Sequence, residues 1–326
     1  MSQPHYTEIA TGIFCLDTGL YRPGLAACYL VRAGDRLACI ETGTSRSVSR
    51  ILAAVAALGL TPEAVDYVIP THIHLDHAGG AGDFMARCPN ARLVIHPKGA
   101  DHMKDPSKLI AGATAVYGKE DFARHFGSLV PISAHRVLVA EGGMTIDLAG
   151  RPLTFIDTPG HANHHACLFD AQTQGWFTGD TFGIAYPELH TPNGPFLFAP
   201  TTPVAFDPDA WQQSLDKLMA YEPKAIYLTH YGRVDDPQVL EDELRQSIRD
   251  LADLALAEEA NTEQGRSERL CAEVGKQLVT RARNQGCALD ESRIREILAV
   301  DIALNAQGLE VWLARRAKQV TERAGG

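Results

Sequence analysis

The chain has no excess of basic residues. Its 326 residues include 30 Lys and Arg against 40 Asp and Glu, which gives a formal net charge of −10. A protein with this balance repels phosphate backbones as a whole rather than attracting them. The composition therefore argues against nucleic acid as a partner.

Long apolar runs are also missing. No stretch of roughly 18 uninterrupted apolar residues occurs, and the N-terminus "MSQPHYTEIATGIF" has neither the basic start nor the apolar run of a secretory signal. We expect no membrane partner and a cytoplasmic location. The 7 cysteines form no C-x-x-C pair, which is typical of reduced and mostly buried thiols.

Short apolar segments bounded by Gly and Pro alternate with helical ones over the first 235 residues. This alternation predicts an α/β fold, an αββα sandwich of two mixed β-sheets packed face to face with helices outside. From Asp236 the sequence turns to segments with helical periodicity, acidic starts and basic ends. We therefore predict two domains, residues 1–235 and a helical C-terminal region of residues 236–326. The expected strands span residues 12–16, 27–32, 36–40, 67–70, 92–96, 136–139, 152–157, 166–170, 175–178 and 225–229, with helices at 47–57 and 209–220.

The motif "THIHLDHAGG", residues 71–80, concentrates groups that bind either a proton or a metal. His72, His74, Asp76 and His77 follow the apolar run "YVIP", so the loop leaves the end of a buried strand. On a helix His72 and His74 would diverge, whereas in a turned loop they can converge while the next two ligands reach a second point. The spacing favours two metal ions side by side over one.

Three further candidates follow expected strands. His161 lies in "TFIDTPGHANHH", Asp180 in "GWFTGD" and His230 in "AIYLTHYG". Polar groups that end several apolar strands are expected to meet at one edge of the sheets. A metal site explains this pattern better than scattered surface histidines do.

The run His72-x-His74-x-Asp76-His77, followed in order by His161, Asp180 and His230, resembles the metallo-β-lactamase superfamily of αββα hydrolases over about residues 8 to 232. The resemblance implies a ligand set for two metals. It gives His72, His74 and His161 to the first ion, Asp76, His77 and His230 to the second, and makes Asp180 the bridge.

A narrower resemblance links "TPGHANHH" to glyoxalase II-type thioesterases, with His165 as the supporting histidine. Asn163 and His164 depart from that pattern. Glu41, in "IETG", stands where many relatives have Asp, and we expect it to support a ligating histidine from behind.

The resemblance implies a dinuclear metal-dependent hydrolase. A hydroxide bridging the metals would attack a small ester, thioester or lactone carbonyl, and Asp76 would be the catalytic carboxylate that orients it. Imidazole and carboxylate ligands suit zinc, iron and manganese alike. We expect two divalent metal ions per chain, with zinc favoured over iron or manganese.

Two other functions stay open. A di-iron oxygen or redox protein, of dioxygenase or oxygen-binding type, is one alternative, because "GDTFG" after Asp180 is similar to the flavin-linked di-iron branch. The chain has His74 where that branch has Glu, and no flavin-binding domain. A non-catalytic effector that keeps its metal site is the other alternative.

Substrate choice is assigned to the loops. The Pro- and Gly-rich segment after Asp180 carries aromatic candidates for a pocket wall, and the insert 98–131 is expected to add helices beside the pocket. The C-terminal helices have apolar stripes around Leu298, Leu309 and Trp312 that predict a homodimer. The pocket candidates are Phe182, Tyr186, Phe196 and Phe198.

Overall fold

A computed structural model of the chain describes residues 6–324, with side chains in the last helix described to Gln319. It divides into two compact units. The first unit contains residues 1–157, 164–179 and 220–235, and the second contains residues 158–163, 180–219 and 236–326. The predicted boundary at residue 236 coincides with one of these breaks, while the two-domain division itself stays a prediction.

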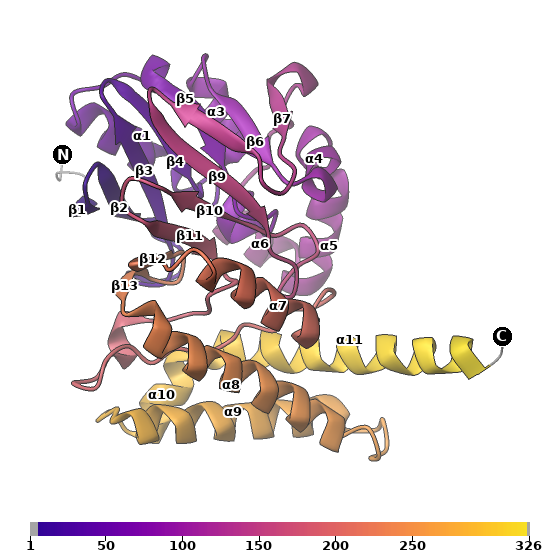
Figure 1. Cartoon of the computed structure of the whole chain (residues 1–326). Coiled ribbons are helices and arrows are strands. Elements are labelled where there is room, and N and C mark those ends of the chain that lie inside the picture. The colour runs from indigo at the N-terminus through magenta and orange to yellow at the C-terminus, as the bar shows by residue number, and fades with distance from the viewer. Residues whose placement is uncertain (1–5, 325–326) are drawn as a thin grey trace. The chain divides into compact units, whose positions relative to one another are not determined.

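Two mixed β-sheets form the first unit (Figure 1). One has seven strands in the order β1 to β7, antiparallel from β1 to β4 and parallel from β4 to β7. Its strands are β1 Tyr6–Ala10, β2 Ile13–Asp17, β3 Ala27–Ala33, β4 Arg36–Ile40, β5 Val65–Ile69, β6 Arg92–Ile95 and β7 Val137–Val139.

The other sheet has six strands in the order β13-β12-β11-β10-β9-β8, with β11 and β12 parallel and the other pairs antiparallel. Its strands are β8 Thr145–Leu148, β9 Arg151–Asp157, β10 Ala166–Asp170, β11 Gly175–Gly179, β12 Ala225–Leu228 and β13 Gly232–Asp235. The predicted pair of mixed sheets is confirmed.

The core between the sheets contains Tyr29 and Ile40 from one sheet and Phe155 and Phe177 from the other. The Tyr29 hydroxyl also donates to the Leu228 carbonyl, which joins the sheets directly. Helices pack on the far side of the seven-stranded sheet through a second cluster. The helices of this unit are α1 Val48–Ala57, α2 Leu75–Ala78, α3 Ala81–Arg87, α4 Pro97–Lys104, α5 Ser107–Tyr117 and α6 Lys119–His125, with short turns at Pro62–Ala64 and Ala134–Arg136.

The second unit is helical apart from its long loop. The predicted helical C-terminal region is confirmed, and α8, α9 and α11 pack against one another (Figure 1). The side chains of Leu298, Leu309 and Trp312 are buried inside this unit, so those stripes are already covered within one chain. The homodimer stays a prediction. The helices are α7 Pro208–Met219, α8 Pro237–Ala257, α9 Arg266–Gln285, α10 Glu291–Ile297 and α11 Ala299–Ala324, with a short turn at Pro187–Leu189.

The cysteines are free and, apart from Cys271, buried. Within the described part of the chain, no single helix is long and apolar enough to cross a membrane. The consecutive helices α10 and α11, bent by 66° between them, meet that test only as a pair.

Candidate metal centre

The polar side chains of the first unit lie where strands end. Glu41 follows β4, His72 comes shortly after β5, and His230 comes shortly after β12. The Thr229 hydroxyl, beside His230, donates to Glu41 Oε1 at 3.1 Å. This bond shows that the ends of strands from both sheets meet at one edge of the sandwich.

Asp76, His77 and His230 form a compact cluster within the first unit. His77 Nε2 lies 3.5 Å and His230 Nε2 lies 3.3 Å from Asp76 Oδ2. One potential ligand atom from each of the three residues lies within 4.8 Å of the others. The set can hold a metal ion, and it is the set that the sequence assigned to the second metal.

Glu41 supports this cluster from below. It is fully buried and has a φ of 60°, a left-handed conformation that only a strongly constrained glutamate adopts. Its Oε1 accepts from the Thr71 hydroxyl at 2.5 Å and pairs with His77 Nδ1 at 3.0 Å, while Oε2 accepts from the Thr71 amide at 3.2 Å. One buried carboxylate therefore fixes the ring of His77 and the start of the ligand loop.

The glycine pair at the end of the motif allows this loop to pack closely. Gly80 donates its amide to the Gly43 carbonyl at 2.9 Å. A Cβ on Gly80 would lie 2.7 Å from the Thr44 carbonyl oxygen, and one on Gly79 would lie 2.3 Å from that of Leu75. Larger residues would push the ligand loop away from Glu41.

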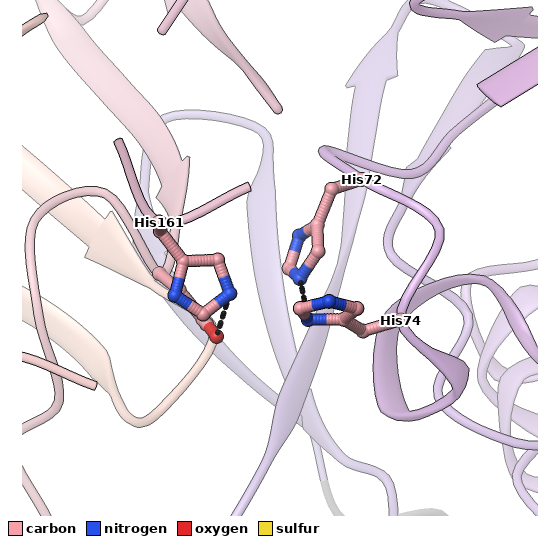
Figure 2. Close-up of side chains that lie close together, drawn as sticks. His72, His74 and His161 are labelled. Atoms are coloured by element: carbon pink, nitrogen blue, oxygen red, sulfur yellow. Dashed lines mark hydrogen bonds and ion pairs between the residues drawn. The ribbon is translucent and has the colours of Figure 1, made fainter. Parts of the chain in front are cut away.

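His72 and His74 lie beside each other in the same unit, as Figure 2 shows. His72 Nε2 is 2.8 Å from His74 Nδ1, and the ring of His165 stacks on His72 with centroids 4.7 Å apart. His164 adds a further imidazole, 5.6 Å from His74 between ring centroids. His164 was missed as a neighbour of the site, because the sequence marks it only as a departure from the relatives.

The second unit contributes His161 and Asp180, which lie 3.3 Å apart between His161 Nε2 and Asp180 Oδ2. The ring of His161 lies edge-on to Trp211 of α7, and Trp211 Nε1 donates to the Thr181 carbonyl at 2.7 Å. Ser214, also on α7, donates to the Pro159 carbonyl at 2.6 Å. Helix α7 thus holds together the two loops that carry this pair.

Three of the histidines have one ring nitrogen committed to an oxygen acceptor. His161 Nδ1 lies 2.8 Å from the Pro200 carbonyl (Figure 2), His230 Nδ1 lies 2.7 Å from the Leu25 carbonyl, and His77 Nδ1 pairs with Glu41. A carbonyl or carboxylate acceptor requires the proton on Nδ1. In the neutral ring, Nε2 then carries the lone electron pair through which imidazole binds a metal.

This donor set passes a test of fit for metal ions. Buried imidazoles beside carboxylates, each held from behind by an oxygen acceptor, are the usual surroundings of histidine-bound metals. No thiol takes part, so the chemistry suits a catalytic ion better than a thiolate-rich structural zinc. The clusters can hold metal ions.

The predicted pocket residues Phe182, Tyr186, Phe196 and Phe198 are all buried in the second unit. Phe196 stacks on Phe198 with centroids 5.7 Å apart, and the Tyr186 hydroxyl donates to Asp301 of α11 at 3.0 Å. These are contacts of a packed interior. A wall over the metals stays a prediction for all four.

One strand-end pair was not assigned to the site. His96 follows β6, and its Nε2 lies 2.8 Å from Asp157 Oδ1 at the end of β9. The position of His96 after an apolar strand is the signal that could have placed it near the same edge.

Residues 21–230 match the model of the metallo-β-lactamase superfamily, nearly two thirds of the chain. The chain belongs to this superfamily. The resemblance in the sequence to the metallo-β-lactamase superfamily is thereby confirmed.

One relative of this chain is named for its fold alone. The chain is 28% identical over 232 residues to the metallo-β-lactamase fold-containing protein ST1585 of Sulfurisphaera tokodaii, across 69% of this chain and 80% of that protein. The solved structure of ST1585 superposes with a TM-score of 0.64 at 23% identity, over 92% of this chain and 98% of that one. This likeness supports the fold.

Two relatives are named for hydrolysis. The acyl-coenzyme A thioesterase MBLAC2 of Gallus gallus is 29% identical over 182 residues, 54% of this chain and 64% of that protein. The N-acyl homoserine lactonase AttM of Azorhizobium caulinodans is 33% identical over 115 residues, 35% of this chain and 39% of that protein. The chain thus spans less than two thirds of either hydrolase.

Proposed function

We propose that this chain is a metal-dependent hydrolase with a dinuclear centre, acting on a small ester, thioester or lactone. The observation that carries the proposal is that Nδ1 of His77, His161 and His230 each faces an oxygen acceptor, the arrangement in which histidine binds a metal through Nε2. The names of the thioesterase and lactonase relatives favour carbonyl hydrolysis.

In this proposal the ligands divide as the resemblance implies. Asp76, His77 and His230 would hold one ion, His72, His74 and His161 would hold the other, and Asp180 would be a ligand of both. When bound, the ions would supply hydroxide near neutral pH and polarise the carbonyl of the substrate.

The chain's own residues prepare that chemistry. Glu41 keeps His77 in one orientation and tautomer, because its Oε1 requires the proton on Nδ1. Asp76 has its Oδ2 within 3.5 Å of two imidazoles, and in this proposal its carboxylate also orients the attacking water. Asp76 is the residue we expect to act catalytically.

Elemental analysis of untagged protein, purified without nickel resin or chelator, tests the metal content. We expect two zinc ions per chain. Hydrolysis of an ester, thioester and lactone panel tests the activity. We expect His230→Ala and His161→Ala each to abolish hydrolysis, while His135→Ala, an exposed histidine, keeps it.

Several outcomes would overturn the proposal. Protein that takes up no metal on reconstitution, or metal-loaded protein that hydrolyses nothing in the panel, would contradict it. Two irons with visible absorbance and reactivity toward oxygen would instead favour the redox alternative. A small-molecule substrate, the absence of nucleic-acid and membrane partners, and the cytoplasmic location stay predictions alongside it.

A further inference from the structure

Helix α5 is largely apolar but only partly buried. Its sequence is SKLIAGATAVY, and none of its residues is fully buried. Leu109, Ile110, Ala113 and Tyr117 are half-buried and recur at helical spacing on one face. Ala115 lies on the opposite face and is exposed. An apolar helix of this kind has surface left to cover.

The half-buried face of α5 borders the metal-ligand loop. Its four apolar residues pack against a small cluster of Leu75, Phe122 and Phe126 within the first unit. Leu75 lies in sequence between His74 and Asp76. The apolar surface therefore begins at the loop that carries the candidate ligands.

Two phenols connect this face to Asp76. Burial and, second to it, the Asp76 charge raise the pKa of Tyr21 to about 12. The same two causes raise the pKa of Tyr117 well above its usual range. Both rings thus lie within electrostatic reach of Asp76, and both stay neutral in ordinary buffers.

The insert is held in place by hydrogen bonds to the neighbouring loop. The Ser45 hydroxyl donates to the Phe126 carbonyl at 3.0 Å, and Arg46 Nη2 donates to the Ala123 carbonyl at 3.0 Å. Tyr21 packs on His125 with ring centroids 4.3 Å apart. Helix α6 therefore fixes α5 beside the ligand loop.

We propose that Leu109, Ile110, Ala113 and Tyr117, here called the acyl wall, bind the hydrocarbon chain of an acyl ester or thioester whose carbonyl lies at the metal centre. This inference rests on the proposed function and names its substrate class. The occupant is a single alkyl chain, because four side chains fall far short of the roughly 20–30 residues a side of a stable protein interface. Continuity with Leu75 favours a ligand that also reaches the metals.

The experiment measures kcat/KM for p-nitrophenyl esters from acetyl to dodecanoyl with the metal-loaded, full-length protein. We expect kcat/KM to rise with chain length, up to about fourfold for each methylene that becomes fully buried. Ile110→Asn should remove most of that rise, through KM, while the acetyl ester reacts within about twofold of the original protein. Ala115→Asn, which places the same new side chain on the opposite, exposed face, should leave the whole series unchanged.

A second variant covers the case in which Ile110→Asn fails to fold. Ala113→Leu adds bulk to the acyl wall without a polar group, so it should reduce kcat/KM for the longest esters and spare the shortest. Equilibrium binding of a dansyl-labelled undecanoic acid, followed by fluorescence, provides a readout independent of catalysis. Its Kd should rise in Ile110→Asn and Ala113→Leu but not in Ala115→Asn.

The outcomes separate the two proposals. Hydrolysis that does not depend on chain length, or that responds equally to Ile110→Asn and Ala115→Asn, would overturn the acyl wall and leave the hydrolase intact. Binding of the dansyl acid that depends on the acyl wall, together with no hydrolysis of any ester, would support the wall as a binding surface and overturn the hydrolase.

Discussion

Glu41 provides the sharpest test of how the site is built. Its carboxylate lies at the meeting point of the two sheets and accepts from Thr71, His77 and Thr229. Glu41→Gln keeps the size of the side chain but replaces one acceptor oxygen with an amide donor. If the amide oxygen stays at the Oε1 position, where three of the donors converge, the new NH₂ group faces the backbone N–H of Thr71.

The size of the effect follows from this geometry. One buried donor loses its acceptor, which costs about 1–3 kcal/mol of unfolding free energy. His77 loses a charged partner on Nδ1, and losing such an outer partner typically weakens metal binding by roughly 10- to 100-fold. We expect the larger effect at the metal assigned to His77, because Glu41 bonds that ring directly and reaches His72 only through Thr71, whose hydroxyl lies 3.1 Å from His72 Nδ1.

Chelator competition measures both effects in one series. Metal-loaded Glu41→Gln and the original protein are titrated with a chelator of known affinity, and urea unfolding of the metal-free forms is measured alongside. Glu120→Gln, an exposed change of the same type, is the control. Unchanged affinity for both metals in Glu41→Gln would refute the view that this carboxylate orients His77, whatever happens to stability.

Three further predictions concern other parts of the chain. Asn305→Leu removes the buried amide that accepts from Thr201 N at 2.7 Å and donates to the Ala199 carbonyl at 3.2 Å. We expect about 1–3 kcal/mol of destabilisation for each buried group left without a partner, together with weaker binding of the metal at His161. A normal affinity for both metals would count against this role of Asn305. Arg151→Met leaves the fully buried carboxylate of Asp170 without the guanidinium that lies 2.7 Å from it. Urea unfolding should show that the unfolding free energy falls by about 3–5 kcal/mol, and by less when Asp170→Leu is added. Equal losses in the single and double variants would contradict the pairing. Burial raises the pKa of the Cys15 and Cys88 thiols from 9.0 to about 12. The folded state therefore keeps these protons at pH values where the unfolded chain releases them, and the unfolding free energy should fall as pH rises from about 9 toward 12. A flat profile above pH 9 that Cys15→Ala and Cys88→Ala leave unchanged would show that neither thiol contributes.

Most strands that the sequence revealed are buried ones, and the exception is the edge strand β7, expected at 136–139. Segments such as 36–40, 166–170 and 225–229 each contain four apolar residues in a row and match β4, β10 and β12 to within a residue. The strands it missed, β1, β8 and β13, lie at the edges of their sheets. In β8 and β13 exposed residues alternate with buried ones, and β1 has no fully buried residue. An edge strand depends on pairing along one side more than on an apolar pattern of its own.

The candidate site divides in the same way. Ligand types and their order could be predicted because histidine and aspartate are rare at the ends of apolar strands. The acceptors that fix the rings could not, because Leu25 and Pro200 act through backbone carbonyls, which any residue provides. The role of Thr229 was also hidden, since a threonine at the end of a strand is common without any function.

The Leu25 and Pro200 carbonyls are held by different parts of the chain. The C-terminal helices help to position one of them. Pro200 lies between Ala199 and Thr201, and these neighbours are bonded to Ser247 of α8 and Asn305 of α11. The C-terminal helices therefore fix the carbonyl that sets the tautomer of His161. The carbonyl of Leu25 comes instead from the segment before β3, whose Ala27 amide donates to the Thr229 carbonyl at 2.7 Å. A change in α8 or α11 should thus reach His161 and spare His230, so the helical region contributes to the geometry of one metal site even though none of its residues is among the candidate ligands.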